Sequence, residues 1–207
     1  NNAAAYWFAL IDADDVWAPD HLAELSRIAD QFPDAGMIST SNVEKDWSSK
    51  IIFPIENRPV IIQKIDYFIE ASKIIGIINS STVAIRRDVF MHLGGFTSAH
   101  AGEDLEYWAR VALHYPVAIS SKVTSFYFRG TGGVMEKIAA KPVKYRSTPE
   151  SLHDLSPSVA MLCDHGLKSP TLWKNTSILT YINSRIQAGI KGALYRGDIA
   201  TARNLSR

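Results

Sequence analysis

The sequence predicts an α/β fold with an open sheet, followed by a helical extension. Three observations lead to this fold class. A short apolar run ends in carboxylates and leads into a helix, further runs of strand composition follow, and the chain has a helical pattern from Pro149 onward. A strand, a polar loop and a helix in succession are typical of an open α/β sheet.

The first elements follow from local composition. Tyr6–Ile11 is predicted as a buried strand, because its apolar and aromatic residues stop abruptly at carboxylates. Gly36–Thr40 is predicted as a strand, Lys45–Pro59 as an irregular excursion with two prolines, and Ile65–Ile75 as a helix. A helix is also predicted after Pro19, since apolar residues recur there at helical spacing: Leu22, Leu25, Ile28, Ala29 and Phe32.

The later elements alternate in the same way. Ser81–Arg86 has strand composition, and Arg87–Phe96 is predicted as a short helix closed by Gly94. Glu103–Tyr115 is predicted as a helix with an apolar stripe. Two further strands are predicted at Pro116–Ser120 and Val123–Phe128.

Composition excludes several classes of protein. With 207 residues, 46% of them hydrophobic, the chain can bury a core and is too apolar to be disordered. The net charge of +1, without basic clusters interleaved with aromatics, argues against a nucleic-acid partner. Cys163, the single cysteine, excludes an internal disulfide and a cysteine metal cluster. Ala3–Ile11 is about half of the roughly 20 residues that a membrane span needs.

Charge is distributed unevenly along the chain. Between Asn1 and Asp34 there are seven acids against Arg27 alone, whereas Lys168–Arg207 holds seven basic residues against Asp198 alone. The basic end is interpreted either as solvated helix faces or as a surface that attracts an anionic lipid or acceptor.

Asp12–Asp15, with the sequence DADD, places three carboxylates in four residues at the end of a predicted strand. Like charges this close repel one another, so the group needs solvent or a cation, and Mg²⁺ or Mn²⁺ prefers such oxygen ligands. The alternative is an exposed acidic turn before a helix. An EF-hand is excluded, because its positions 5, 6 and 12 hold Val16, Trp17 and Ala23.

A second acidic group, Gly102–Asp104, opens the predicted helix at Glu103. Carboxylates at this place are favoured by the exposed N–H groups and by the helix dipole. This describes either a functional carboxylate pair or an ordinary helix cap.

Three segments together resemble the family 2 glycosyltransferases of the GT-A fold, over roughly Ala5–Arg129. They are ALIDADDVWAPDHL, SSTVAIRRDVFMHLGGF and GEDLEYWARVALHYPVA. The resemblance implies a mixed sheet flanked by helices at 1–146, with a helical extension at 147–207. Only eleven residues precede Asp12, so we expect the nucleotide-binding half of the GT-A domain to be missing, which leaves the activity of this chain open.

The resemblance implies transfer of a sugar from a nucleotide diphosphate, expected to be UDP, to a hydroxyl of a glycan or lipid-linked acceptor with inversion. Asp14 would be the direct ligand of Mn²⁺ or Mg²⁺, and Asp12 would reach the ribose or the metal through water. Asp15 would cap the helix or support its neighbours. Asp104 matches the catalytic base, and Glu103 would orient the acceptor or the base.

Three further residues match family positions. Trp108 would wall the sugar or acceptor pocket, with a core position as the alternative. Arg110 would bind substrate or form a surface salt bridge, and Arg129 would meet a phosphate. Many relatives carry a histidine shortly after that arginine, and here its place is taken by Thr131.

The implied role is surface polysaccharide or other glycan synthesis in the cytoplasm, at the inner face of the plasma membrane. The alternative function is a non-catalytic interaction module of the same fold, which docks a partner or an anionic membrane through its basic helical end. The sequence does not indicate the oligomeric state.

Overall fold

The computed structural model describes residues 5–52, 59–99, 101–132 and 154–206. These residues form two compact units. The sheet unit comprises Asn1–Tyr67, Gly76–Gly95 and Val111–Gly132, and the helical unit comprises Phe68–Ile75, Phe96–Arg110 and Gly133–Arg207. The predicted domain boundary after residue 146 lies outside the described residues.

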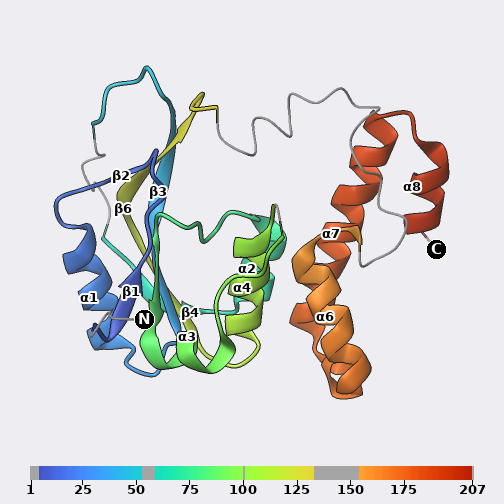
Figure 1. The fold of residues 1–207 in the computed structure, drawn as a ribbon, viewed down its shortest axis with the longest axis horizontal. Coiled ribbons are helices and arrows are strands. Elements are labelled where there is room, and N and C mark those ends of the chain that lie inside the picture. Colours follow the sequence, from blue (N-terminus) through green and yellow to red (C-terminus); the bar gives the residue numbers. More distant parts are fainter. Residues whose placement is uncertain (1–4, 53–58, 100, 133–153, 207) are drawn as a thin grey trace. The chain divides into compact units, whose positions relative to one another are not determined.

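The sheet unit is built on six strands in the order β1-β5-β3-β6-β2, with β4 also paired to β6 (Figure 1). The pairing of β3 with β6 is parallel and the other pairings are antiparallel, so the sheet is mixed as predicted. The strands are β1 (Trp7–Ala9), β2 (Val16–Trp17), β3 (Met37–Asp46), β4 (Ile62–Ile65), β5 (Val83–Arg86) and β6 (Val117–Arg129).

Helix α1 (His21–Gln31) packs against β3 and β6, and the short α3 (Arg87–Leu93) follows β5 directly. The helix predicted after Pro19 is thus present, and Leu25 and Ile28 of its apolar series are buried. Leu22, of the same series, is 58% exposed. The reason is that α1 also buries the polar residues His21 and Glu24, which turns Leu22 away from the core.

Four predicted elements differ in extent. The two strands predicted at 116–120 and 123–128 are one continuous strand, β6. β3 runs on to Asp46, into the predicted irregular excursion. Ile62–Ile65 is a strand that was not predicted, and the helix expected from Ile65 is α2 (Tyr67–Lys73). Apart from the missed strand β4, these are errors of boundary, which local composition fixes poorly.

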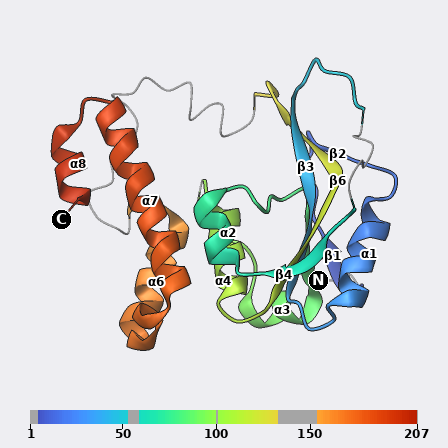
Figure 2. The same cartoon turned by 180° about the vertical axis from the view of Figure 1, so that it is seen from behind.

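The C-terminal region is helical wherever the structure describes it, as predicted (Figure 2). Ser156 caps α6 by accepting the Val159 N–H at 3.3 Å, and Asn175 caps α7 by accepting the Ser177 and Ile178 N–H groups. No helix in the described residues is long and apolar enough to span a membrane. The helical unit contains most of α4 (Glu103–Ala112). In the C-terminal region it contains α6 (Pro157–Lys168), η3 (Pro170–Lys174), α7 (Thr176–Tyr195) and α8 (Ile199–Leu205).

Candidate active site

The acidic segment Asp12–Asp15 forms a turn between β1 and β2. The turn closes on itself, because the Asp15 N–H donates to the Asp12 carbonyl at 3.1 Å. Ser81, just before β5, holds it from the neighbouring part of the sheet: the Ser81 hydroxyl accepts the Asp12 N–H at 3.0 Å, and its carbonyl accepts the Trp17 indole N–H at 2.7 Å. The turn is therefore fixed by a residue more than sixty positions away.

Asp15 is the buried member of the turn. Its Oδ1 accepts the Phe128 N–H at 3.0 Å, which ties the turn to β6. Its Oδ2 is buried and has no hydrogen-bond partner among the described residues. Burial raises the pKa of Asp15, and hydrogen bonding to Ser81 and Phe128 opposes this rise. Asp15 therefore contacts the backbone of β6, and its role in supporting the neighbouring carboxylates stays a prediction.

Asp14 lies partly exposed and meets the far end of β6. Its Oδ2 accepts a hydrogen bond from the Thr131 hydroxyl at 2.7 Å. Thr131 stands between two glycines whose backbones are in the left-handed region, Gly130 at φ 82° and Gly132 at φ 75°. Residues other than glycine rarely adopt this conformation. Thr131 is thus brought into contact with the predicted metal ligand, and only the tertiary structure shows this contact.

The carboxylates of this turn fit a hard divalent cation in part. Asp12 is exposed and Asp14 is half-buried, and both offer the oxygen ligands that Mg²⁺ and Mn²⁺ prefer. No group of three or more His, Cys, Asp or Glu residues suited to a metal occurs in the described chain. Mg²⁺ is commonly bound by one or two carboxylates plus substrate phosphates, so two aspartates and a diphosphate would satisfy it.

Arg129, expected to meet a phosphate, is engaged within the sheet. Its guanidinium forms an ion pair with Glu44 on the parallel strand β3, and Nη2 donates to Oε2 at 3.1 Å. Both side chains are exposed. A phosphate contact by Arg129 stays a prediction, and it would compete with Glu44.

The second predicted carboxylate pair, Glu103 and Asp104, opens α4 in the helical unit. Gly102 precedes it with φ 78°, so a glycine is needed at the entry to the helix. Asp104 Oδ1 accepts the Leu105 N–H at 2.7 Å, and one carboxylate oxygen of Glu103, Oε2, is buried without a partner among the described residues. Burial raises the pKa of Asp104, and the neighbouring charge of Glu103 adds to the rise.

Pro157 and Tyr181 of the C-terminal helices lie near this pair, and the sequence did not predict either. A Cβ placed on Gly102 would lie 3.2 Å from the Pro157 ring at the start of α6. Tyr181 of α7 is fully buried, bonds to the Ser158 hydroxyl at 2.8 Å and packs edge-on against Phe68. Burial raises the pKa of Tyr181, and the Asp104 charge contributes to the rise. No sequence signal pointed to Tyr181, because 77 positions separate it from Asp104.

Trp108 and Arg110 also lie in the helical unit. The Trp108 side chain is fully buried and forms aromatic contacts with Phe96 and Tyr107. Arg110 donates two hydrogen bonds to Glu106, at 2.8 and 2.9 Å, and its guanidinium lies 4.8 Å from the Tyr107 ring centre. Both alternatives weighed for these residues, core packing and a salt bridge, are present, and substrate contact by either stays a prediction.

The predicted site residues therefore divide between the two units. The sheet unit holds the aspartate turn together with Ser81 and Thr131, and the helical unit holds Glu103 and Asp104 together with Tyr181 and Ser158. Sequence reasoning selected the carboxylates as local groups, and their roles stay predictions. It missed the Ser81 and Thr131 hydroxyls, which form hydrogen bonds with the aspartate turn. Serine and threonine are ordinary residues, and only their position in the fold brings them to this turn.

Comparison with known proteins supports the fold. No protein-family model matches the chain, and a search of curated proteins finds no match. Among solved structures, the crystal structure of S. aureus TarS residues 1–349 in complex with UDP-GlcNAc has a TM-score of 0.53 and 14% identity, covering 98% of this chain and 67% of that one. A second crystal structure of S. aureus TarS 1–349 gives a TM-score of 0.49 and 15% identity, covering 99% and 66%.

The first of these likenesses establishes the fold, a mixed α/β sheet flanked by helices that resembles the GT-A fold of TarS. The chain spans about two thirds of the length of those TarS chains. The fold class predicted from the sequence is confirmed.

Proposed function

We propose that this protein transfers a sugar from a nucleotide-diphosphate donor to an acceptor hydroxyl with inversion at the anomeric carbon. The observation that carries the proposal is the Asp12–Asp15 turn, fixed by Ser81 and Phe128 and presented at a strand end of a GT-A-like sheet. TarS was crystallised with UDP-GlcNAc, which supports a UDP-sugar as donor here. Glycan or lipid-linked acceptors are part of the same proposal.

Asp14 and Asp12 would hold the divalent cation, either Mn²⁺ or Mg²⁺. A bound cation would act as a Lewis acid that neutralises charge on the departing diphosphate. Asp14 is the better direct ligand, because the Thr131 hydroxyl orients its carboxylate through Oδ2. Asp12 is more exposed and would contact the ribose, or the cation through water.

Asp104 would remove the proton from the attacking hydroxyl. Its carboxylate is held at the start of α4 by the Leu105 N–H, and burial makes it a stronger base than an ordinary aspartate. Glu103 would orient the acceptor. Because inversion is a single displacement, no residue needs to form a covalent intermediate, and Cys163 has no role in the reaction.

Three finer assignments belong to the same proposal. Family 2 membership rests on the order of the three sequence segments that resemble that family. A nucleotide-binding half preceding the aspartate turn in the complete enzyme rests on the same resemblance. A place in polysaccharide synthesis at the inner face of the plasma membrane follows from both.

Titration of the 207-residue chain with Mn²⁺, with and without UDP, tests the donor side. We expect Mn²⁺ binding that Asp14→Asn weakens by at least about tenfold, and that UDP strengthens, because diphosphate oxygens complete the coordination. Asp30→Asn, which removes an exposed acid of α1, is the control and should bind as the wild type does. Equal Mn²⁺ binding by the wild type and Asp14→Asn would remove the cation from this turn.

The alternative function, an interaction module without catalysis, is separated from this proposal by chemistry. An interaction module would bind neither Mn²⁺ nor UDP and would show no sugar transfer. Its predicted docking surface, the basic helical end, does not require the aspartate turn. The two functions are therefore tested by independent experiments.

A further inference from the structure

The hairpin of α7 and α8 carries large apolar side chains on its outside. Its interior is formed by small or modest residues: Ala193, Ala202 and Leu205 are buried, and a Cβ on Gly189 would lie 3.2 Å from Leu205. At the bend, Leu194 is 51% exposed, Tyr195 94% and Ile199 51%. Hydrophobic residues scattered singly over a surface need no explanation, but three within six positions at one bend form a patch.

The bend itself is rigidly specified. Gly197 adopts φ 73°, which ends α7 tightly, and the Asp198 carboxylate accepts the Thr201 N–H at 3.0 Å, which starts α8. Hydrogen bonds from Thr201 lower the pKa of Asp198. Asp198, the acid of the bend, is therefore engaged as a helix cap, and the exposed apolar residues stand on both sides of Gly197 in the chain.

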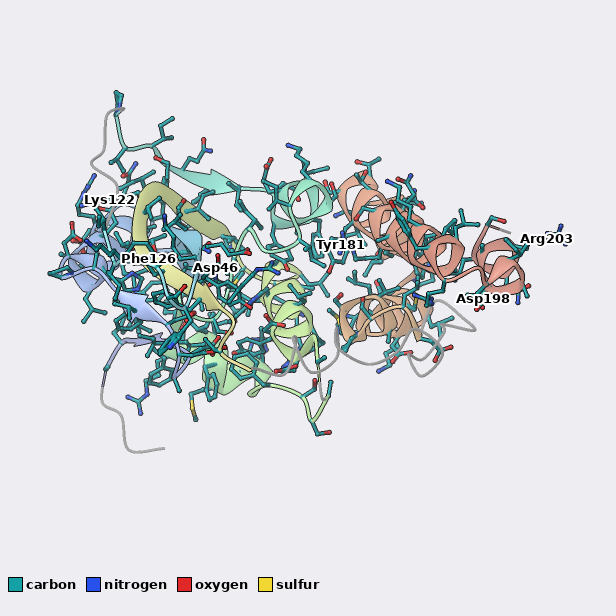
Figure 3. All side chains as sticks on the ribbon, turned by 90° about the horizontal axis from the view of Figure 1, so that it is seen from above. Asp46, Lys122, Phe126, Tyr181, Asp198 and Arg203 are labelled. Atoms are coloured by element: carbon teal, nitrogen blue, oxygen red, sulfur yellow. The ribbon has the colours of Figure 1, made fainter. Side chains whose placement is uncertain are left out.

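Basic residues flank the patch on both helices. Lys191 lies three and four positions before Leu194 and Tyr195 on α7, and Arg203 lies four positions after Ile199 on α8, so each shares a helix face with its apolar neighbour. Both basic residues are exposed. Figure 3 shows Arg203 extending outward from α8, and labels Asp198, the residue that caps the start of this helix.

We propose that this bend, defined as Lys191, Leu194, Tyr195, Ile199 and Arg203, binds the surface of an anionic lipid bilayer. The apolar side chains would enter the headgroup region, with the tyrosine hydroxyl facing the polar zone, and the two cations would contact lipid phosphates. The contact is a superficial one, made at the membrane surface. It does not depend on the proposed glycosyl transfer.

Charge complementarity selects this partner. Lysine and arginine on either side of an apolar tip match a surface that is apolar below and negatively charged above. A second copy of the chain docked through the same bend would bring two further cations, and no acid other than the capping Asp198, to this surface.

Sedimentation of the 207-residue chain with phosphatidylcholine vesicles, with and without phosphatidylglycerol, tests the proposal. We expect binding to the anionic vesicles at low salt, and loss of most of it at high salt, because screening removes the electrostatic part. The triple variant L194S/Y195S/I199S should bind at least about tenfold more weakly, and K191E/R203E should reduce binding to the level of neutral vesicles.

The matched control changes residues of the same kinds elsewhere in the helical unit. L167S/K168E/K174E removes an exposed leucine and two cations away from the bend, and should keep most of the binding. Circular dichroism should show that all variants stay helical, since none of the substituted side chains is buried.

Two results would overturn the proposal. Either the wild type does not sediment with anionic vesicles at low salt, or the bend variants and the control bind equally. A dimer in analytical ultracentrifugation that L194S/Y195S/I199S abolishes, without vesicle binding, would instead assign the patch to a second copy of the chain.

Discussion

The Thr131 hydroxyl donates a hydrogen bond to Asp14 Oδ2 at 2.7 Å, joining the end of β6 to the acidic turn after β1. Asp14 is the predicted metal ligand, and Thr131 takes the place at which many relatives of the proposed family carry a histidine. From sequence alone, Thr131 would be interpreted as the loss of that histidine. In the structure, Thr131 is in direct contact with the aspartate turn. A hydroxyl at this place can orient the Asp14 carboxylate without adding charge, and this role of Thr131 is a prediction.

Replacing Thr131 by valine should weaken Mn²⁺ binding by about tenfold to a hundredfold, the usual effect of removing a hydrogen bond to a ligating carboxylate. Valine keeps the shape of threonine but cannot donate to Asp14. Thr131→Ser keeps the hydroxyl and should bind Mn²⁺ nearly as the wild type does. Calorimetric titration measures all three proteins, and wild-type affinity in Thr131→Val would show that the hydrogen bond has no bearing on cation binding.

Asp104→Asn should abolish sugar transfer in the complete enzyme and leave donor binding nearly unchanged. An amide has the size of the carboxyl group but cannot accept the proton of the acceptor hydroxyl. Because the pKa of Asp104 is raised by burial, transfer should also lose activity on acidification at a higher pH than an ordinary aspartate would give. Measured turnover by Asp104→Asn would assign the base to another residue.

The stability of the sheet unit should fall as the solution is acidified below the ordinary pKa of histidine. Burial lowers the pKa of His21 to about 4, opposed by contacts with Thr124 and Asp20. Between pH 6.5 and 4 the unfolded chain therefore binds a proton that the folded chain does not. The contribution of His21 to the free energy of unfolding is therefore fully present above pH 6.5, and it is lost progressively as the pH falls from 6.5 toward 4.

Urea unfolding at pH 7 and pH 5 measures this effect, with an expected loss of about 2 kcal/mol in the free energy of unfolding. His21→Gln keeps a polar side chain that does not titrate in this range, and should lose less stability over the same interval. An equal loss in the wild type and the variant would place the pH dependence elsewhere.

Tyr181 and Ser158 should show a measurable coupling energy. Their hydroxyls are 2.8 Å apart, and both side chains are fully buried, so removing either leaves the other without this partner. We expect Tyr181→Phe and Ser158→Ala each to cost about 1–3 kcal/mol in the free energy of unfolding, and the double variant to cost less than the sum. Additive costs in this double-mutant cycle would mean that the hydrogen bond contributes nothing to stability.

Much of the fold followed from local patterns. The sequence predicted that Gly94 closes a short helix, since glycine is common just after a helix end. Gly94 does so, with a φ of 78°. The α1 helix followed from its apolar spacing, although the burial of His21 and Glu24 did not. Glu24 Oε1 accepts the Ser120 hydroxyl at 2.6 Å, and His21 Nδ1 bonds to Thr124 Oγ1 at 2.7 Å. From sequence, polar residues such as His21 and Glu24 are expected to be exposed. They are buried here because β6 supplies hydrogen-bond partners for them.

The sequence by itself determined the two carboxylate groups and the elements that present them. A strand end followed by three aspartates and a glutamate–aspartate pair at a helix start are local features, fixed by neighbours in the chain. The tertiary structure decided which of these carboxylates is buried and what holds each one. Phe128 fixes Asp15, and Thr131 fixes Asp14, across more than a hundred positions. Such contacts depend on the sheet order, which no local pattern encodes.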